Sequence, residues 1–176
     1  MAEYESKPTP IMDFYEAASA RRSVRNYKNS PVPEEKLARV WEAVRQAPSA
    51  CNLQPWRFLV IKSPAMREKL KSILQGWVFT APVIIVALGN RDAAWRRDGQ
   101  SYHEVDVAIA TEHLCLAAAA EGLGTCWICA FDRRAMKWAL GLSPEWDPVA
   151  VTPLGFPDDP NSRTLRKALD EIVQEI

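Results

Sequence analysis

The stretch that most constrains the fold is VDVAIATEHLCLAAAAEGLG at residues 105–124, which is long, apolar and rich in alanine. Alanine favours the helix more than any other residue, and Gly122 supplies the stop that is common at helix C-termini. The small side chains also let neighbouring elements approach closely. We therefore predict a long helix that lies buried at the centre of the domain.

Strands and amphipathic helices are expected around this helix. The run PVIIVALG at residues 82–89 is continuously apolar and rich in β-branched residues, which is typical of a buried central strand. Helical spacing and flanking prolines predict further helices, and short apolar runs predict further strands. The helices are expected at residues 11–20, 30–48, 63–74 and 132–142, and the strands at 56–62, 125–129 and 147–157.

Three segments differ from this alternation. Residues 1–10 are interpreted as an N-terminal arm, ahead of a single domain over residues 11–176. Residues 90–103 are polar and are expected to form an irregular, mobile surface excursion. The tail at residues 164–176 is amphipathic, so it is expected to form a helix or to dock as an arm. Because the elements alternate irregularly, without repeat or linker, the fold class is predicted to be α+β.

The composition excludes several classes of protein. The chain has 176 residues, enough for one domain, and its 22 Lys and Arg balance its 22 Asp and Glu. A nucleic-acid-binding protein would usually show a basic excess. No apolar run approaches the roughly 20 residues that cross a bilayer, and the N-terminus lacks the pattern of a signal peptide. We therefore expect a cytoplasmic protein that binds neither nucleic acid nor a membrane.

The cysteines do not form an evident functional pattern. There are four, which is too few for a disulfide framework in a chain of this length. Cys126 and Cys129 form a C-x-x-C motif, but the motif follows the predicted helix and lies in an extended segment. Along a strand, an odd separation points two side chains to opposite faces. The pattern therefore argues against a dithiol centre, and no second C-x-x-C completes a metal site.

The stretch ARRSVRNYK concentrates positive charge around Arg21, Arg22 and Arg25. In a helix or in an extended segment, its spacing brings two guanidiniums onto one face, where a phosphate would fit between them. The hydroxyl of Ser23 could add a donor. The alternative is a helix C-terminus carrying cations that interact favourably with the helix dipole. The spacing alone leaves both interpretations open.

The loop APSACNLQPWRF, residues 47–58, sets the polar side chains of Ser49, Asn52 and Gln54 between prolines. Each amide carries donors and an acceptor, so these groups can read the edge of a flavin or a nucleobase. The prolines stiffen the loop and would hold the amides in place before binding. A purely structural turn is equally compatible, because Asn and Ser are common in loops.

The motifs of several enzyme classes are absent. The dinucleotide fingerprint fails because Trp127 stands where its third glycine belongs. The sequence has no Walker A motif and no Gly-x-Ser-x-Gly elbow. His103 and His113 lack partners at zinc-type spacing, so no metal site is expected. If the chain is an enzyme, a cofactor carries the chemistry.

Four motifs together resemble a known family. RRSVRNY, APSACNLQPWRFLVI, GLGTCWICAF and PLGFP occur in the order and rough spacing of the FMN-dependent nitroreductase family, over residues 12–173. The P-S-x-x-N-x-Q-P-W loop is the most specific of them. For a short, single-domain member, the resemblance implies a three-layer sandwich in which helices flank a mainly antiparallel central sheet. It also implies an obligate homodimer with two FMN molecules at the subunit interface.

The resemblance assigns residues to the cofactor as well. The basic cluster would hold the FMN phosphate and pyrimidine edge, and the amide loop would reach FMN from the partner subunit. Backbone N–H groups near Cys129 would face flavin N5 and O4. In the tail, Arg166 would close on the phosphate, with Arg163 as its substitute. The implied cofactor-binding residues are Arg21, Arg22, Ser23, Arg25, Pro48, Ser49, Ala50, Asn52, Gln54, Trp127, Ile128, Cys129, Ala130 and Arg166.

The family reaction is ping-pong: NAD(P)H passes a hydride to flavin N5, and a nitroaromatic, quinone or similar acceptor then takes two electrons. No side chain is expected to be catalytic. The alternatives are a dehalogenating or flavin-degrading enzyme on the same fold, a non-catalytic flavin-binding or sensor module, and a thiol oxidoreductase. The chain departs from the family pattern in its short length, which leaves only residues 90–103 to cover the pocket, and in Cys129, where many relatives have glycine.

Overall fold

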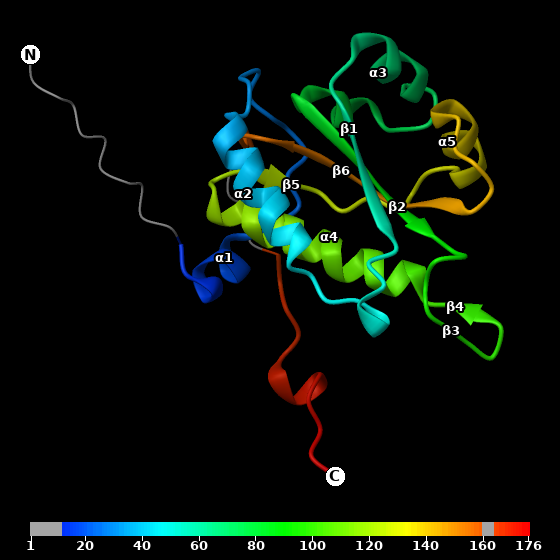
Figure 1. Cartoon of the computed structure of the whole chain (residues 1–176). Helices are drawn as coiled ribbons and strands as arrows, with labels where there is room; N and C mark the ends of the chain where they lie inside the picture. Colours follow the sequence, from blue (N-terminus) through cyan, green and yellow to red (C-terminus); the bar gives the residue numbers. More distant parts are fainter. Residues whose placement is uncertain (1–11, 160–163) are drawn as a thin grey trace, which may run out of the picture.

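A four-stranded antiparallel sheet organises the structure, in the strand order β1-β2-β6-β5 (Figure 1). The computed structural model describes residues 12–159 and 164–176. The α-helices are α1 (Phe14–Ala20), α2 (Glu34–Arg45), α3 (Pro64–Leu70), α4 (His103–Ala120) and α5 (Arg133–Leu140). The strands are β1 (Trp56–Ile61), β2 (Val83–Asn90), β3 (Arg96–Arg97), β4 (Gln100–Ser101), β5 (Gly124–Thr125) and β6 (Trp146–Gly155), and 3₁₀ turns are η1 (Ala50–Asn52), η2 (Gly76–Thr80) and η3 (Leu169–Glu171).

Strand β2 lies at the centre of the sheet because both of its edges are paired. It runs antiparallel to β1 on one side and to β6 on the other. The short strand β5 extends the sheet beyond β6. The prediction of a buried central strand at residues 82–89 is confirmed, since every residue of β2 before Asn90 is buried.

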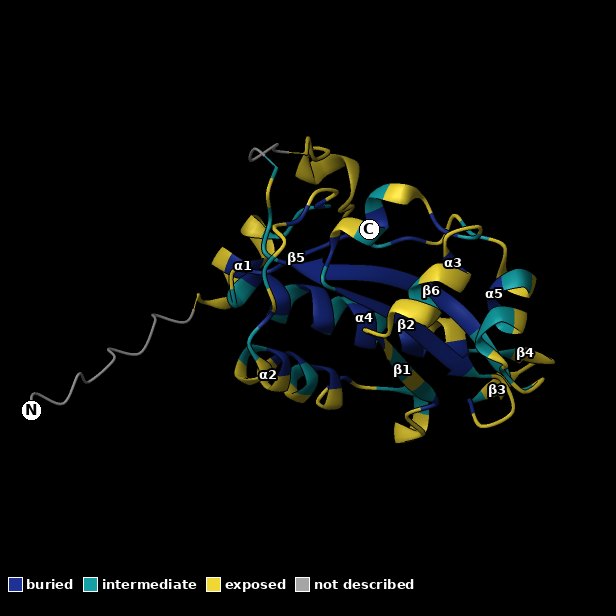
Figure 2. Ribbon diagram, turned by 90° about the horizontal axis from the view of Figure 1, so that it is seen from above, coloured by how far each residue is buried: buried dark blue, intermediate teal, exposed yellow. Residues whose placement is uncertain are grey.

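Helices cover both faces of the sheet, because β2 sends alternate side chains to opposite sides. Val83 and Ile85 pack in one core with residues of α2 and α4. Ile84 and Val86 pack in a second core with residues of α3 and α5. Figure 2 shows β2, β6 and the inner side of α4 buried, whereas much of the edge strand β1 and the outer faces of α2 and α3 are exposed or half-buried. The predicted three-layer α+β sandwich is therefore confirmed.

Helix α4 is the central helix that the sequence predicts. It lies against the sheet and also contacts α1 and α2. Ala110 and Ala118 are fully buried, which is the close approach expected from small side chains. Gly122 adopts a φ of +72°, and the Leu123 N–H donates to the Ala118 carbonyl at 2.8 Å. These two features are those of a glycine-terminated helix, so the predicted end is confirmed.

The other predicted helices are present with shorter bounds. Helix α1 begins with a capping box in which the Asp13 side chain accepts from the Glu16 N–H. Helix α5 is capped at its start by Asp132, whose side chain accepts two backbone N–H groups, and at its end by Gly141, which has a φ of +63°. Helix α3 ends at Leu70, before its predicted end. Within residues 12–159 and 164–176, no helix combines the length and the apolar character that a membrane crossing requires.

The prediction of an irregular segment at residues 90–103 is wrong in part, because residues 96–97 and 100–101 form strands. Strands β3 and β4 pair as a small antiparallel hairpin. Asp98 and Gly99 form its turn, with φ of +51° and +80°. Asp-Gly favours a two-residue hairpin because both central residues of that turn need a positive φ. The signal for the hairpin was thus present in the sequence.

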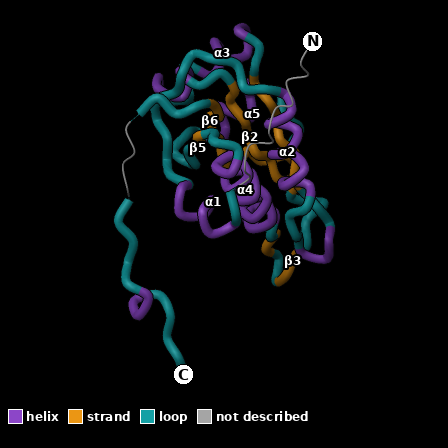
Figure 3. The backbone as a smooth tube through the Cα atoms, turned by 90° about the vertical axis from the view of Figure 1, so that its left-hand side faces the viewer, coloured by secondary structure: helices purple, strands orange, loops and turns teal. Residues whose placement is uncertain are grey.

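The tail at residues 164–176 does not form the amphipathic helix that was one of its two expected states. It contains one short 3₁₀ turn, η3, and runs away from the domain (Figures 1 and 3). Every residue of the tail is exposed, including the apolar Leu165 and Ile172. A short amphipathic helix depends on a surface that covers its apolar face, and the described chain offers this tail none. The predicted N-terminal arm, residues 1–10, lies outside the described residues.

Gly124 of β5 lies against Val24, in the extended segment before α2, so a substitution at Gly124 tests how tightly this segment packs on the sheet edge. A Cβ at this position would lie 2.7 Å from Val24 Cγ2 and 2.9 Å from Val24 Cβ. Val24 is buried and β-branched, so it cannot rotate away. Gly124→Ala is expected to lower the free energy of unfolding by about 1–3 kcal/mol, measured by urea denaturation.

Gly76→Ala serves as the control, because a Cβ at Gly76 would meet nothing within 4 Å. Its stability is expected to stay within about 0.5 kcal/mol of the wild type. Equal stability of the Gly124→Ala and Gly76→Ala proteins would contradict the tight contact between Val24 and β5.

Candidate functional site

The basic cluster, residues 21–25, lies mostly in an extended segment that docks along β5. The Val24 N–H donates to the Thr125 carbonyl at 2.9 Å, and Ser23 pairs with Thr125 as a parallel bridge. Helix α1 ends where the cluster begins, so the extended alternative of the sequence analysis is the correct one. This docking brings the cluster to the start of the CWICA segment, residues 126–130.

Carboxylates hold two of the arginines in the cluster. Arg22 Nη2 donates to Asp159 Oδ1 at 2.6 Å, and this hydrogen bond lowers the pKa of Asp159. Arg21 Nε lies 3.4 Å from Glu112 Oε1 on α4. Arg25 has an exposed side chain, and its backbone N–H donates to Asp159 Oδ2 at 3.3 Å. Asp159 therefore orders the cluster by accepting from the Arg22 side chain and from the Arg25 backbone.

Arg21 and Arg22 line a cavity of about 240 Å³, which residues 122–125 and Ala119 close from the end of α4. Arg22 Nη1 is buried and has no hydrogen-bond partner among the described residues. A buried cationic donor without an acceptor is costly, so an anion bound beside this guanidinium would stabilise the site. The residues present therefore fit a phosphate group in charge and in donors.

The amide loop, residues 48–54, is held in shape by its own hydrogen bonds. Ser49 Oγ accepts the Gln54 N–H at 2.8 Å, and Gln54 Nε2 donates to Asn52 Oδ1 at 3.1 Å. Cys51, Asn52 and Gln54 have positive φ of 51°, 53° and 49°, a region that is unfavourable for residues other than glycine. Backbone strain of this kind concentrates at functional sites. Asn52 and Gln54 are exposed, so the loop presents two ordered amides to a ligand.

The loop and the arginine cluster lie at opposite ends of α4. The Ala50 N–H donates to Asp106 Oδ1 near the start of the helix, whereas the cavity reaches Ala119 near its end. A helix rises about 1.5 Å per residue, so these two points are separated by about 20 Å. A single chain therefore does not bring the two predicted halves of the site together.

The CWICA segment separates its cysteines as the odd spacing predicts. Cys126 is buried in the core under α5, Cys129 is exposed, and both are free thiols. Between them, Ile128 exchanges two backbone hydrogen bonds of 2.9 Å with β6. The Trp127 Nε1–H donates to Cys129 Sγ at 3.0 Å. These positions are not those of a dithiol centre.

Two backbone donors of this segment have no partner in the part of the chain that the structure describes. Cys129 and Ala130 are exposed, and neither backbone N–H donates to any residue that the structure describes. They follow Ile128, whose own N–H is used by the sheet. The geometry therefore fits the donors that the resemblance assigns to this segment.

The tail residue Arg166 does not join the other predicted site residues. It is exposed, and its Nη1 donates to the carbonyls of Leu165 and Thr164 in its own tail. Its substitute, Arg163, lies outside the described residues. No group of three or more His, Cys, Asp or Glu side chains suitable for a metal occurs in residues 12–159 and 164–176.

The carboxylates that hold the arginines and the loop were not predicted from the sequence. Asp106 and Glu112 lie among apolar residues of a mainly apolar helix, and an acid in such a run is a signal that could have been used. Asp159 carries no comparable signal, because it lies 137 residues from Arg22 in the sequence. Only the folded chain brings that pair together.

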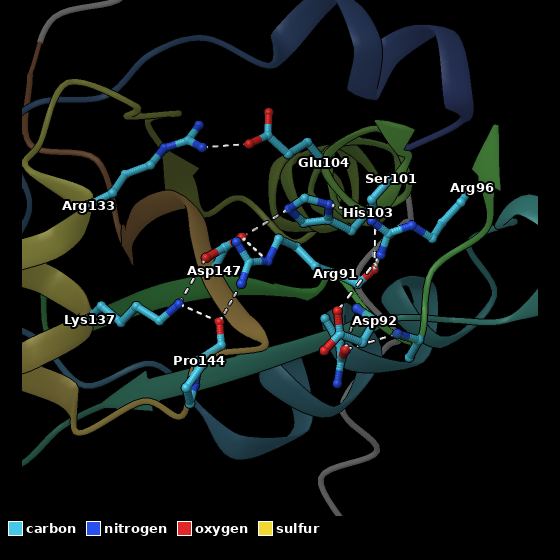
Figure 4. A network of polar contacts seen from close by, with 12 residues as sticks. Arg91, Asp92, Arg96, Ser101, His103, Glu104, Arg133, Lys137, Pro144 and Asp147 are labelled. Atoms are coloured by element: carbon cyan, nitrogen blue, oxygen red, sulfur yellow. Dashed lines mark hydrogen bonds and ion pairs between the residues drawn. The ribbon is translucent and has the colours of Figure 1, made fainter. Parts of the chain in front are cut away.

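A polar network pins the β3–β4 hairpin at the opposite end of α4 from the cavity (Figure 4). Asp147 of β6 lies 3.0 Å from Lys137 Nζ, 3.3 Å from Arg91 Nε and 3.5 Å from His103 Nε2. Ser101 Oγ donates to the Arg91 carbonyl at 3.0 Å and lies 3.1 Å from His103 Nδ1. The other ring nitrogen, Nε2, is buried and makes no hydrogen bond to any residue that the structure describes. These contacts tie the hairpin to α4, α5 and β6.

Comparison with known proteins shows to which family this chain belongs. The model of the nitroreductase family matches residues 18–78 and 70–156. The chain belongs to the nitroreductase family. A relative from Thermus thermophilus named NADH dehydrogenase is 31% identical, over 93% of this chain and 96% of that protein. Iodotyrosine deiodinase from Thermotoga neapolitana is 25% identical, over 85% of this chain and 91% of that protein.

Solved structures of nitroreductase-family proteins share the fold. One from Clostridium difficile 630 is 32% identical, with a TM-score of 0.86 over 93% of this chain and 98% of that one. A structure from Exiguobacterium sibiricum, in complex with FMN, has a TM-score of 0.86 over 97% of this chain and 100% of that one. Its identity is 22%, so the match shows a shared fold. The chain is therefore an oxidoreductase-family protein with the nitroreductase fold.

The two cysteines of the CWICA segment are expected to differ in reactivity. In flavin-free protein, a thiol reagent such as DTNB should modify the exposed Cys129 quickly and the buried Cys126 only after unfolding. Peptide mass spectrometry identifies the modified residue. The buried Cys115, whose pKa burial raises to about 11, is the slow-reacting control. A Cys126–Cys129 disulfide in folded, air-oxidised protein would contradict this arrangement.

His103 is expected to make the stability depend on pH. Burial lowers the pKa of this imidazole, and the nearby Asp147 carboxylate opposes the shift without reversing it. The folded protein then binds fewer protons than the unfolded chain, whose histidine has a pKa of about 6.5, so stability is lost as the pH falls below that value. The melting temperature of the wild type should therefore fall more steeply than that of His103→Gln between about pH 7.5 and 5.5. Parallel pH profiles of the two proteins would contradict a neutral, buried His103.

Proposed function

We propose that this chain is an FMN-dependent oxidoreductase that uses NAD(P)H as electron donor. The observation that carries the proposal is the cavity lined by Arg21 and Arg22, with its unpaired buried Arg22 donor, at the start of the CWICA segment. When bound, FMN would supply the redox chemistry by taking a hydride from NAD(P)H and passing two electrons to a nitroaromatic, quinone or similar acceptor. The FMN complex of a protein with the same fold supports this choice of cofactor.

The chain's own residues bind and position rather than transfer protons. Arg21 and Arg22 supply fixed positive charge for the phosphate and for negative charge on the flavin edge. The N–H groups of Cys129 and Ala130 supply donors from a backbone that β6 holds in place through Ile128. No side chain is assigned a catalytic role.

A homodimer would complete the site. The amide loop lies about 20 Å from the cavity along α4, so the loop of a second copy is needed beside the first copy's arginines. Large apolar side chains are exposed on α1 at Phe14 and Tyr15, on the loop at Leu53 and on α4 at Val105. Exposed apolar surface of this kind is typical of subunit interfaces. The extended tail, with Arg166, would then reach the partner subunit. A cytoplasmic location stays a prediction.

Flavin binding and reduction test the proposal. The purified protein should be yellow or become yellow with added FMN, anaerobic NADH or NADPH should bleach the flavin bands, and a nitroaromatic or quinone should restore them. Protein that takes up no FMN would contradict the proposal. Flavin that binds but is reduced by neither nucleotide would favour the sensor alternative. Release of halide from a halogenated aromatic, and no turnover of quinones or nitroaromatics, would favour the dehalogenating alternative suggested by the deiodinase relative.

Arg21 and Arg22 are expected to bind the phosphate of FMN. Arg22→Ala and Arg21→Ala are each expected to weaken FMN binding by about tenfold or more, because each removes a charge-assisted contact. Fluorescence titration of flavin-free protein measures the dissociation constant. Arg45→Ala is the control, since Arg45 pairs with Glu42 on the exposed surface of α2. Affinities equal to that of the control would contradict the phosphate assignment.

A further inference from the structure

The buried carboxylate of Asp106 on α4 makes a hydrogen bond to which the proposed reaction assigns no role. Asp106 is 2% exposed, and its Oδ1 accepts the Ala50 N–H at 2.9 Å. Its Oδ2 is buried and has no hydrogen-bond partner among residues 12–159 and 164–176. The residues around it on the helix, Val107 and Ala110, belong to the apolar core.

Burying the Asp106 carboxylate at this position costs free energy. An acid of this kind is desolvated, and one of its oxygens has no described donor to compensate. The position near the helix N-terminus is favourable for negative charge, but the exposed Glu104 in the same turn already provides such a charge. The hydrogen bond to the Ala50 N–H is therefore the feature that gives Asp106 a specific task.

That hydrogen bond joins the body of the protein to the strained part of the amide loop. The bonds between Ser49, Asn52 and Gln54 tie the loop to itself. The Asn90 N–H donates to the Pro55 carbonyl at 2.7 Å and fixes the end of the loop. Asp106 fixes its beginning, directly before the left-handed residues at 51 and 52. The carboxylate thus holds the loop between two anchors, in a backbone conformation that residues other than glycine rarely adopt.

We infer that Asp106 is a positioning residue for FMN binding, which acts through the amide loop. This inference rests on the proposed function, because the loop matters only if its amides meet FMN. Asp106 sets the loop before the cofactor binds, so the ordering of the loop does not have to occur during binding. Loss of the anchor weakens FMN binding through the loop and leaves the arginine cavity at the other end of α4 unchanged.

Hydrogen exchange and FMN titration test the inference on the same proteins. In flavin-free Asp106→Ala protein, the loop amides at residues 50–54 should exchange about tenfold faster or more, and FMN binding should weaken by a similar factor. Asp106→Asn keeps an amide oxygen that can accept the Ala50 N–H, so it should restore most of the protection and of the affinity.

A second variant removes the same hydrogen bond from the loop side. Ala50→Pro deletes the N–H donor, yet Ala50 is the first residue of η1 and follows Ser49, whose φ of −142° and ψ of 160° suit the residue before a proline. It should weaken FMN binding like Asp106→Ala, and it keeps the inference testable if Asp106→Ala does not fold. Thr111→Val is the control, because the fully buried Thr111 hydroxyl bonds only to the Val107 carbonyl in its own helix among the described residues. Its loop exchange and FMN affinity should match the wild type.

The outcomes separate this inference from the proposed function. Wild-type protein that binds FMN, together with Asp106→Ala protein that binds it equally well, would overturn the inference and leave the proposed function standing. Loop exchange in Asp106→Ala that equals the wild-type rate would also overturn the inference. Wild-type protein that takes up no FMN would overturn the proposed function whatever the exchange rates. Weaker binding with faster loop exchange in both variants, and recovery in Asp106→Asn, would support the inference.

Discussion

The burial of α4 is the constraint on which the rest of the structure depends. The helix is covered by the sheet, by α1 and by α2, so both of its ends are fixed in the domain. One end carries the amide loop through Asp106, and the other end borders the cavity at Ala119. Because a helix has a fixed rise per residue, its length sets the distance between these two features. A change of packing along α4 would therefore move the site as well as the core.

The β5 edge of the sheet positions the groups of the candidate site relative to α4. The extended segment at residues 21–25 docks on β5 through the Val24 N–H, which places two arginine side chains at one cavity. Asp159 and Glu112 then restrict where these side chains lie. The same edge continues into Ile128, which bonds to β6, and the N–H groups of the next two residues, both exposed, have no hydrogen-bond partner among the described residues. Positive charge and backbone donors thus share one continuous edge, which is the arrangement that suits an anionic, redox-active ring system.

The sequence predicted the parts of the fold that follow from local patterns. Burial of β2 and termination of α4 at Gly122 needed only apolar periodicity and a glycine with positive φ. The Asp98-Gly99 pair also encodes the hairpin locally, although the polar composition around it favours an irregular segment. The tail was ambiguous, because an amphipathic pattern predicts a helix only where a surface covers its apolar face.

The candidate site was proposed from sequence motifs, whereas its contacts follow only from the fold. The order of the motifs led to the prediction that the arginine cluster, the amide loop and the CWICA segment bind the cofactor. The partners of these groups come from distant parts of the chain, as in the pair of Arg22 and Asp159, and no local pattern encodes them. The separation of the loop from the cavity also follows only from the folded length of α4. That separation is the reason to expect a site shared between two copies of the chain.

Mixed dimers test the shared site most directly. Chains carrying Arg22→Ala and chains carrying Ala50→Pro can be co-expressed with different affinity tags, and the doubly tagged dimers can be titrated with FMN. If each site combines the arginines of one chain with the loop of the other, both lesions fall in one site and the second site is intact. The account then predicts one tight FMN site per mixed dimer, although neither variant alone binds FMN tightly. Mixed dimers that bind FMN no better than the single variants would contradict it.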